Sequence, residues 1–491
     1  MSKKQNITRY KNTNLSPFLK GPAVLNHISP PQFIRNFMYP KIDIMDDFIA
    51  ARAQMALSLG FHIIFACVGM VMPFLMAFAH WKYLKTNNEV YKGLTKAWSK
   101  GVAILFATGA VSGTMLSFEL GLLWPGFMKH AGPIFGMPFS LEGTAFFIEA
   151  IAIGFFLYGW DKFNKWFHWF CGFLVGLSGL ASGILVVAAN AWMNSPSGFD
   201  YINGQYVNID PIKAMFNEAW FPQALHMTVA AFCATGFAVA GVHAYLIMRK
   251  KNVEFHTKAF KIAAGFALIG AFGAPLSGDV AAKSVAKRQP IKLAAMEAHF
   301  ETEKGAPFIL GGIPDESKGE VKYAIKIPKV LSFLVSNDFN AEVKGLNDFP
   351  RDEWPPVAVV HYSFQIMIFF GVVMICIGSV YLYAFFFRKE WLSKNWLLKT
   401  FLFATPFGYI ALEAGWTVTE VGRQPWIIYG VMRTIDAVTP MPGIQYSFYF
   451  FTAIFVSLSL IIIFLLRRQI KMVPKLYDPT DIQFKTKNKE L

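Results

Sequence analysis

The sequence predicts an all-α polytopic membrane protein with about nine transmembrane helices. Apolar runs of about 20 residues recur along the chain, and each is long enough to cross a bilayer as a helix. The chain is 54% hydrophobic and only 16% charged, whereas a soluble protein carries about 25% charge. Because lipid offers no hydrogen-bond partner to the backbone, runs of this length indicate helices.

The expected spans are residues 53–80, 98–122, 138–160, 168–192, 221–248, 259–281, 355–387, 395–420 and 446–467. Strongly basic connections alternate with connections that carry few positive charges; the basic ones are 80–100, 249–261, 388–399 and 467–475. The positive-inside rule therefore predicts a cytoplasmic C-terminus and an external N-terminus, with loops 123–137 and 193–220 outside. Membrane topology thus explains the net charge of +15 without nucleic acid.

Composition divides the chain into an N-terminal extension, six helices, a long hydrophilic loop, three helices and a cytoplasmic tail. These parts are residues 1–44, 45–281, 282–354, 355–467 and 468–491. The extension is basic and lacks the apolar core of a signal peptide. It is either a translocated disordered segment or the result of a start assigned too early, with Met38 or Met45 first, and we favour the second interpretation.

The long loop at 282–354 contains the Gly/Pro-rich stretches GAPFILGGIP and FPRDEWPP. Glycine and proline in such stretches mark turns, which indicates a partly folded loop and not a simple linker. The parity of the helices places this loop outside.

Two histidines, His62 and His226, lie well inside expected spans. A polar side chain at membrane depth needs a specific partner. Neutral imidazole is a common axial ligand of haem iron, and a bundle of Phe-rich helices suits haem; a structural hydrogen bond is the alternative. Met367 alone would be core filler, but opposite His226 its thioether would complete a Met/His low-spin haem.

Acidic residues occur in two pairs, Glu142 with Glu149 and Glu413 with Glu420. Members of each pair are about two helical turns apart, so they face the same side of a helix. Stacked carboxylates inside a membrane indicate a proton route or metal ligands, and a buried helix–helix hydrogen bond is the alternative. Small polar residues that would extend such a route, or serve close helix packing, are Ser178, Ser182 and Asn190.

The stretch GWTVTEVGRQPW places Glu420 and Arg423 at the end of a long apolar run. An ionisable residue at that depth costs about 2.5–3.5 kcal/mol and usually lines a cavity or binds something. Lys292 and Glu297, in KLAAMEA of the long loop, by themselves predict only a solvated helix face. The four cysteines form no CxxC pair, and the sequence contains no P-loop and no HExxH.

Several stretches together resemble subunit I of the cytochrome bd-type quinol oxidases. They are ARAQMALSLGFH, SLEGTAFFIEA, FFLYGWDKF, VAANAWMNSP, GDVAAKSVAKRQPIKLAAMEA, LGGIPD and EAGWTVTEVGRQPW. They follow the family's order across about residues 45–470, and the long loop stands where the family has its Q-loop, which carries the quinol site.

The resemblance implies a low-spin haem b, a high-spin haem b, and a haem d or a third haem b in its place. His226 and Met367 match the axial ligands of the low-spin haem. His62 and Glu420 match the ligands of the two high-spin haems, and which ligand serves which haem stays open.

The remaining site residues follow from the same resemblance. Glu142 and Glu149 match acidic residues that lead protons to the oxygen site, with Glu142 close to the two high-spin haems. Lys292 and Glu297 match residues of the quinol site. Arg423 and Trp416 flank the high-spin haems, where Arg423 suits a haem propionate or another carboxylate.

The implied function is that of a terminal respiratory oxidase in the bacterial cytoplasmic membrane. Quinol would be oxidised at the outer face, O2 would be reduced to water, and charge separation would build a proton gradient without pumping. The implied partners are subunit II and in some cases a small single-span subunit. The alternatives are a haem d-free, cyanide-insensitive oxidase of the same family and, less favoured because no inverted repeat is visible, a proton-coupled transporter.

The sequence departs from the family at two places. Relatives carry Arg two residues before the ligand methionine, and here that position is Gln365. Without that cation we expect the low-spin haem to have a lower reduction potential. The Q-loop also lacks a longer C-terminal insertion, so the chain resembles the short-loop branch, and the preferred quinone stays open.

Overall fold

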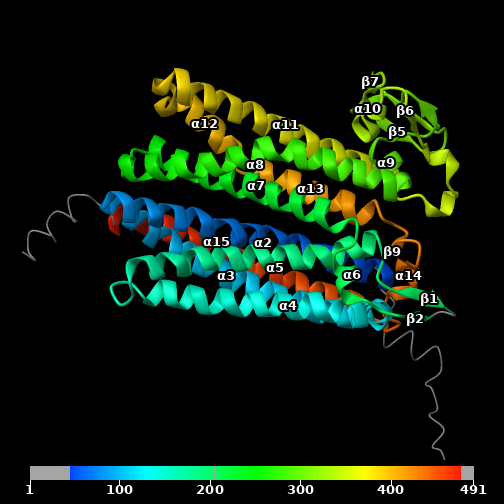
Figure 1. Ribbon diagram of the computed structural model, residues 1–491, viewed down its shortest axis with the longest axis horizontal. Coiled ribbons are helices and arrows are strands. Elements are labelled where there is room, and N and C mark those ends of the chain that lie inside the picture. The colour runs from blue at the N-terminus through cyan, green and yellow to red at the C-terminus, as the bar shows by residue number, and fades with distance from the viewer. Residues whose placement is uncertain (1–44, 203–204, 477–491) are drawn as a thin grey trace, which may run out of the picture. The chain divides into compact units, whose positions relative to one another are not determined.

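The computed structural model describes residues 45–202 and 205–476, which form a bundle of long helices (Figure 1). Residues 1–44 and the end of the tail, 477–491, lie outside the described residues. Eight helices in the described part are long and apolar enough to cross a membrane. They are α2 (Asp47–Thr86), α3 (Glu89–Leu123), α4 (Pro125–Tyr158), α5 (Lys165–Asn194), α7 (Trp220–Met248), α8 (Val253–Arg288), α11 (Val357–Phe387) and α15 (Ile444–Leu476). The predicted all-α polytopic fold is confirmed.

The span expected at 395–420 is divided into two shorter helices, α12 (Asn395–Phe403) and α13 (Phe407–Val421). Pro406 precedes α13, and its missing N–H and fixed φ interrupt a continuous helix. The hydroxyl of Thr405 donates to the carbonyl of Phe401 at 3.4 Å, so the break is partly satisfied from within the chain. The apolar run in the sequence conceals this break.

Two helices extend beyond their expected ends. The segment 123–137, expected as a loop, forms most of the first half of α4, and Pro125 stands in its first turn, where proline is preorganised for a helix. Pro133 and Pro138 lie inside α4 and disturb the helical pattern of the sequence, which explains the shorter prediction. At the other boundary, α8 continues to Arg288, past the expected end at 281.

Helix α7 packs closely on both α8 and α13. A Cβ atom on Gly236 would collide with the backbone of Ala267, and one on Gly270 would collide with the backbone of Cys233, so α7 and α8 approach backbone to backbone. A Cβ atom on Gly408 would collide with Ala234 in the same way, which seats α13 on α7. Small residues at such crossings permit close helix packing in lipid, where no hydrophobic force drives association.

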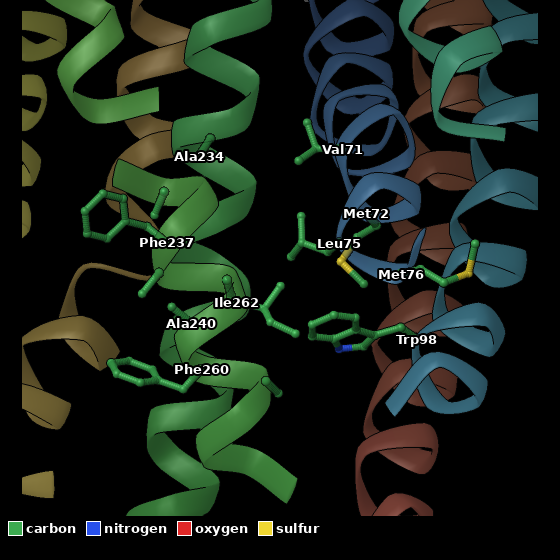
Figure 2. Close-up of a cluster of buried hydrophobic side chains, with 14 of the residues drawn as sticks. Val71, Met72, Leu75, Met76, Trp98, Ala234, Phe237, Ala240, Phe260 and Ile262 are labelled. Carbon is green, nitrogen blue, oxygen red and sulfur yellow. The ribbon is translucent and has the colours of Figure 1, made fainter. Parts of the chain in front are cut away.

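A large apolar cluster joins the two sides of the bundle. Figure 2 shows Leu75 and Trp98, from α2 and α3, facing Ile262 of α8. Farther into the α7 side, Phe237 stacks on Phe401 of α12 with ring centroids 5.5 Å apart, and Phe260 meets the same ring edge-on at 5.0 Å. These contacts pack α2 and α3 against α8, and α12 against α7 and α8.

The Q-loop is folded, as its Gly/Pro content predicts, and it lies at one end of the bundle (Figure 1). Its helical elements are α9 (Pro290–Met296), α10 (Val330–Ser336), η1 (Leu346–Asp348) and η2 (Arg351–Glu353). Its strands are β3 (Glu303–Lys304), β4 (Phe308–Leu310), β5 (Ile313–Asp315), β6 (Glu320–Lys322), β7 (Ile325–Ile327) and β8 (Glu342–Val343), paired antiparallel as β3–β8, β4–β7 and β5–β6. The core of this region is formed by the apolar face of α9 against α11.

Other connections gather at the same end of the bundle (Figure 1). They are the hairpin β1 (Asp200–Ile202) and β2 (Gln205–Val207), helix α6 (Pro211–Met215), the hairpin β9 (Trp426–Ile428) and β10 (Met432–Arg433), and α14 (Thr434–Ala437). The 3₁₀ turn η3 (Lys389–Ser393) joins α11 to α12. At the start of α15 the carboxylate of Asp47 accepts from the amides of Gly443 at 3.1 Å and Ile444 at 2.9 Å, which favours that helix N-terminus.

Candidate functional site

Glu420 lies in the last turn of α13, and Arg423 follows in the turn directly after the helix. Nη2 of Arg423 donates to Oε2 of Glu420 at 2.7 Å, and the amide of Asn190 on α5 donates to Oε1 of the same carboxylate. The Arg423 side chain is only 2% exposed. Its Nε and Nη1 atoms are buried and have no hydrogen-bond partner among the described residues. This guanidinium therefore has capacity for a further anion.

Lys292 of α9 reaches the same carboxylate through two asparagines. Its Nζ atom donates to Oδ1 of Asn194 at 2.6 Å and to the carbonyl of Thr419 at 3.2 Å. The amide of Asn194 donates to Oδ1 of Asn190 at 3.1 Å, and Asn190 bonds to Glu420. A continuous polar chain thus runs from the Q-loop to the end of α13.

Lys292 is almost completely buried in this position. Burial holds the pKa of its amine well below the usual range, and the nearby guanidinium of Arg423 acts in the same direction. The stem of Lys292 lies against Gly422, where a Cβ atom would come within 3.0 Å of its Cγ atom. The solvated face that composition alone suggests for this lysine is wrong.

Glu297, the second residue expected at the quinol site, faces other partners. Its carboxylate accepts a backbone hydrogen bond from Ile309 of β4, and its Oε2 atom is buried without a partner among the described residues. Burial raises the pKa of Glu297 to about 8. Although Lys292 and Glu297 are close in sequence, Lys292 turns toward α5 and α13 and Glu297 turns toward the Q-loop strands.

Gln365, two residues before Met367, holds the Q-loop on α11. Its Nε2 atom donates to the carbonyl of Ile309 at 2.9 Å, and its Oε1 atom accepts from the amide of Gly311 at 3.1 Å. His361, one turn earlier, contacts the carbonyls of Met296 at 2.9 Å and Gly311 at 3.1 Å. The strand that contacts Glu297 is therefore fixed by side chains of α11.

The two histidines expected as haem ligands share one arrangement. Nδ1 of His62 on α2 lies 2.9 Å from the hydroxyl of Ser112 on α3. Nδ1 of His226 on α7 lies 3.0 Å from the hydroxyl of Ser277 on α8. The Nε2 atom of each ring has no hydrogen-bond partner among the described residues, so it is the nitrogen available to a metal.

Met367 lies on α11 with its sulfur against α13. A Cβ atom on Gly415 would be 3.1 Å from Sδ of Met367, so this glycine leaves room for the thioether. Trp416, which follows Gly415 in α13, is half-buried against the large apolar cluster and forms no polar contact with the described residues. The structure thus places Met367 beside α13, the helix whose last turn carries Glu420.

The expected carboxylate pairs face neighbouring helices. Ser182 of α5 donates to Oε1 of Glu142 at 3.0 Å, which supports the predicted extension of that pair by serine. Glu149 is 8% exposed, and a Cβ atom on Gly179 of α5 would lie 3.4 Å from its Oε2 atom. Glu413 points toward Gly60 of α2, where a Cβ atom would lie 3.3 Å from its Oε2 atom. Ser178, in contrast, donates to the backbone of its own helix at 2.6 Å.

Sequence reasoning missed the serines that contact the histidines and the asparagine that bridges to Lys292. Ser112, Ser277 and Asn194 belong to apolar segments in which small polar residues are common, and no spacing distinguishes them. It also missed a buried pair, in which the amide of Gln54 donates to Glu119 at 3.2 Å between α2 and α3. Intramembrane polarity was the one available signal.

The residues present fit haem, the group that the resemblance implies. Two imidazoles are fixed through Nδ1 with Nε2 available, and a thioether lies over a glycine. Arg423 offers two buried N–H-bearing nitrogens to a carboxylate such as a propionate. Each oxygen of the Glu420 carboxylate accepts one hydrogen bond and retains a second lone pair for a metal.

Comparisons with known proteins agree with this chemistry. The sequence model of the family described as Cytochrome bd terminal oxidase subunit I matches residues 50–474. The chain is 37% identical over 433 residues to the putative cytochrome bd menaquinol oxidase subunit I of Bacillus subtilis (strain 168), which covers 86% of this chain and 96% of that protein. It is 32% identical over 444 residues to the cytochrome bd ubiquinol oxidase subunit 1 of the same organism, with coverages of 87% and 94%.

A solved structure supports the same relationship. The bd oxidase from Geobacillus thermodenitrificans superimposes with a TM-score of 0.83 at 38% sequence identity, covering 87% of this chain and 98% of that chain. The family match spans all eight long helices and the Q-loop. The resemblance inferred from sequence stretches is therefore confirmed, and the chain belongs to the cytochrome bd terminal oxidase subunit I family.

Proposed function

We propose that this chain oxidises quinol at the outer face of the bacterial cytoplasmic membrane and reduces O2 to water. It would hold a low-spin haem b, a high-spin haem b, and a haem d or a third haem b. The observation that carries this proposal is the polar chain Lys292–Asn194–Asn190–Glu420. It joins a Q-loop residue expected at the quinol site to a residue expected at the oxygen site.

At the quinol end, Glu297 is suited to accept a proton from the substrate. One of its carboxylate oxygens is held by the Ile309 amide, and the other has no partner among the described residues. Its pKa of about 8 is close to the working pH, as general-base catalysis favours. Protons released here would leave to the outside.

Four side chains would hold the haems. His226 and Met367 would bind the low-spin haem through Nε2 and Sδ, and His62 and Glu420 would bind the two high-spin haems. When bound, haem supplies one-electron transfer and the binding of dioxygen. Arg423 would balance the charge of Glu420 and of a propionate, since its Nη2 is already paired with Glu420 and its other nitrogens are buried.

Proton delivery would use α4 and α5. Glu149 and Glu142 face the same side of α4, and Glu142 already accepts from Ser182. Protons taken from the cytoplasm would move along these carboxylates toward the oxygen site. Because quinol protons leave outside and the protons consumed come from inside, turnover would separate charge without a pump.

The orientation and the partners complete the proposal. The N-terminus and the Q-loop would lie outside and the C-terminus in the cytoplasm, as the basic loops predict. The loops expected outside, including the Q-loop, gather at one end of the bundle, which supports a common side (Figure 1). As a subunit I, the chain would assemble with subunit II, and in addition with a small single-span subunit in some complexes.

The test is a dithionite-reduced minus oxidised absorbance spectrum of the purified complex, with haem extraction and quinol-driven oxygen consumption. A red-shifted chlorin band beside b-type bands, with oxygen uptake, is the expected result. Only b-type bands with oxygen uptake would assign the chain to the haem d-free branch. A complex without haem would overturn the proposal and leave the intramembrane carboxylates to a transport function.

A further inference from the structure

Ser112 is buried at the interface of α2 and α3, and its hydroxyl contacts both its own helix and a histidine of α2. Its hydroxyl donates to the carbonyl of Thr108, one turn earlier in α3, at 2.9 Å. Because a serine hydroxyl has a single proton, a proton given to that carbonyl leaves the oxygen as an acceptor toward Nδ1 of His62, 2.9 Å away. This arrangement favours the neutral tautomer that carries its proton on Nδ1 and its lone pair on Nε2.

Ser277 repeats this arrangement in a different pair of helices. It is 2% exposed, its hydroxyl donates to the carbonyl of Ala274 at 3.1 Å, and its oxygen lies 3.0 Å from Nδ1 of His226. Other serines of the described chain also bond to their own helix; Ser117, for example, donates to Gly113 at 3.1 Å. Among the described residues, Ser112 and Ser277 are the serines whose hydroxyls contact a histidine ring.

We propose that Ser112 and Ser277 are positioning residues, each of which holds one histidine with its Nε2 atom directed at haem iron. This inference rests on the haem ligation in the proposed function. The partner of the second ring nitrogen fixes the tautomer and orientation of a metal-binding histidine and raises its basicity. The chain would thus contain the same serine–histidine contact twice, from α3 to His62 and from α8 to His226.

The residue after each serine is a glycine that lies against the ring. A Cβ atom on Gly113 would be 3.1 Å from Cε1 of His62, and one on Gly278 would be 3.5 Å from Cε1 of His226. The first distance is tighter than ordinary van der Waals contact and the second is ordinary contact. Gly113→Ala should therefore displace its histidine, whereas Gly278→Ala should not.

The experiment compares Ser112→Ala and Ser277→Ala in the purified complex, each with a Ser→Thr variant that restores the hydroxyl. Ser117→Ala is the matched control, because it removes a serine of α3 that bonds only to its own helix. The readouts are haem content, the reduced-minus-oxidised spectrum and the reduction potential of each haem. Loss of the Nδ1 acceptor makes the imidazole a poorer electron donor, so the potential should rise.

The expected result is selective. Ser277→Ala should alter only the low-spin haem, and Ser112→Ala only a high-spin haem, with affinity for that haem roughly 10–100-fold lower. A tenfold change in the relative affinity for ferric over ferrous haem corresponds to about 59 mV for one electron. Threonine should restore the wild-type values.

Two other outcomes would overturn the inference. Unchanged spectra and potentials in both alanine variants would show that the hydroxyls do not support the rings. Equal changes in all haems, from either variant, would indicate a general packing defect. A different result would refute the proposed function itself: full haem content in both His62→Ala and His226→Ala would remove the ligands that the serines are said to position.

Discussion

Replacement of Glu297 by Gln tests the proposed proton acceptor at the quinol site. Glutamine keeps the oxygen that accepts from Ile309 and replaces the unpartnered oxygen with an amide, so the fold of the Q-loop should be preserved. With a pKa of about 8, the wild-type carboxylate is ionised to roughly 10% at pH 7 and roughly 90% at pH 9. Because only the carboxylate accepts a proton, kcat/KM for quinol should rise about ninefold between these pH values.

The assay is the initial rate of quinol-dependent oxygen consumption by the detergent-solubilised complex from pH 6.5 to 9, corrected for autoxidation. The Glu297→Gln variant should lose most of the rise and be at least about tenfold slower than wild type at pH 9. Glu342→Gln is the matched control, because Glu342 is an exposed carboxylate of the same loop. An identical pH profile in wild type and Glu297→Gln would refute the reasoning.

Four other substitutions test the rest of the site. Asn194→Leu removes the 2.6 Å acceptor of the buried Lys292, so the complex should lose about 1.5–3 kcal/mol of stability, and an unchanged thermal transition would contradict this. Glu142→Ala and Glu149→Ala should slow oxidase turnover but leave quinol-driven reduction of the low-spin haem intact, and full turnover in both would reject the relay. Gln365→Arg should raise the reduction potential of the low-spin haem in a redox titration, and an unchanged potential would contradict the electrostatic argument. Because the substitution breaks the contacts of Gln365 to Ile309 and Gly311, it should also speed protease cleavage of the Q-loop.

Local patterns in the sequence predicted the features that depend on one helix. The apolar runs locate the long helices, and the seven-residue spacing that predicts Glu142 and Glu149 on one side of a helix agrees with their contacts to Ser182 and Gly179 of α5. The break between α12 and α13 was missed because the flanking apolar residues on both sides of Pro406 continue the same run.

Features that depend on two helices needed the structure. The contact of Lys292 with Asn194 joins residues 98 positions apart, and that of His62 with Ser112 joins residues 50 positions apart. Each depends on the relative rotation and register of packed helices, which composition and periodicity do not determine. Resemblance to the family supplied the predicted ligands, but it named neither Ser112 nor Ser277, which contact the two histidines among them.

The opposite orientations of Lys292 and Glu297 separate two tasks that the sequence assigns to one short segment. Glu297 lies among the Q-loop strands, where the contacts of Gln365 to Ile309 and Gly311 fix its surroundings. Lys292 lies against the end of α13, joined by hydrogen bonds to the carboxylate of Glu420. Displacement of α9 would therefore disturb both environments together, since Lys292 lies in this short helix and Glu297 directly follows it. Helix α9 thus couples the position of Glu297, the proposed proton acceptor for quinol, to the charge balance around Glu420, the predicted haem ligand.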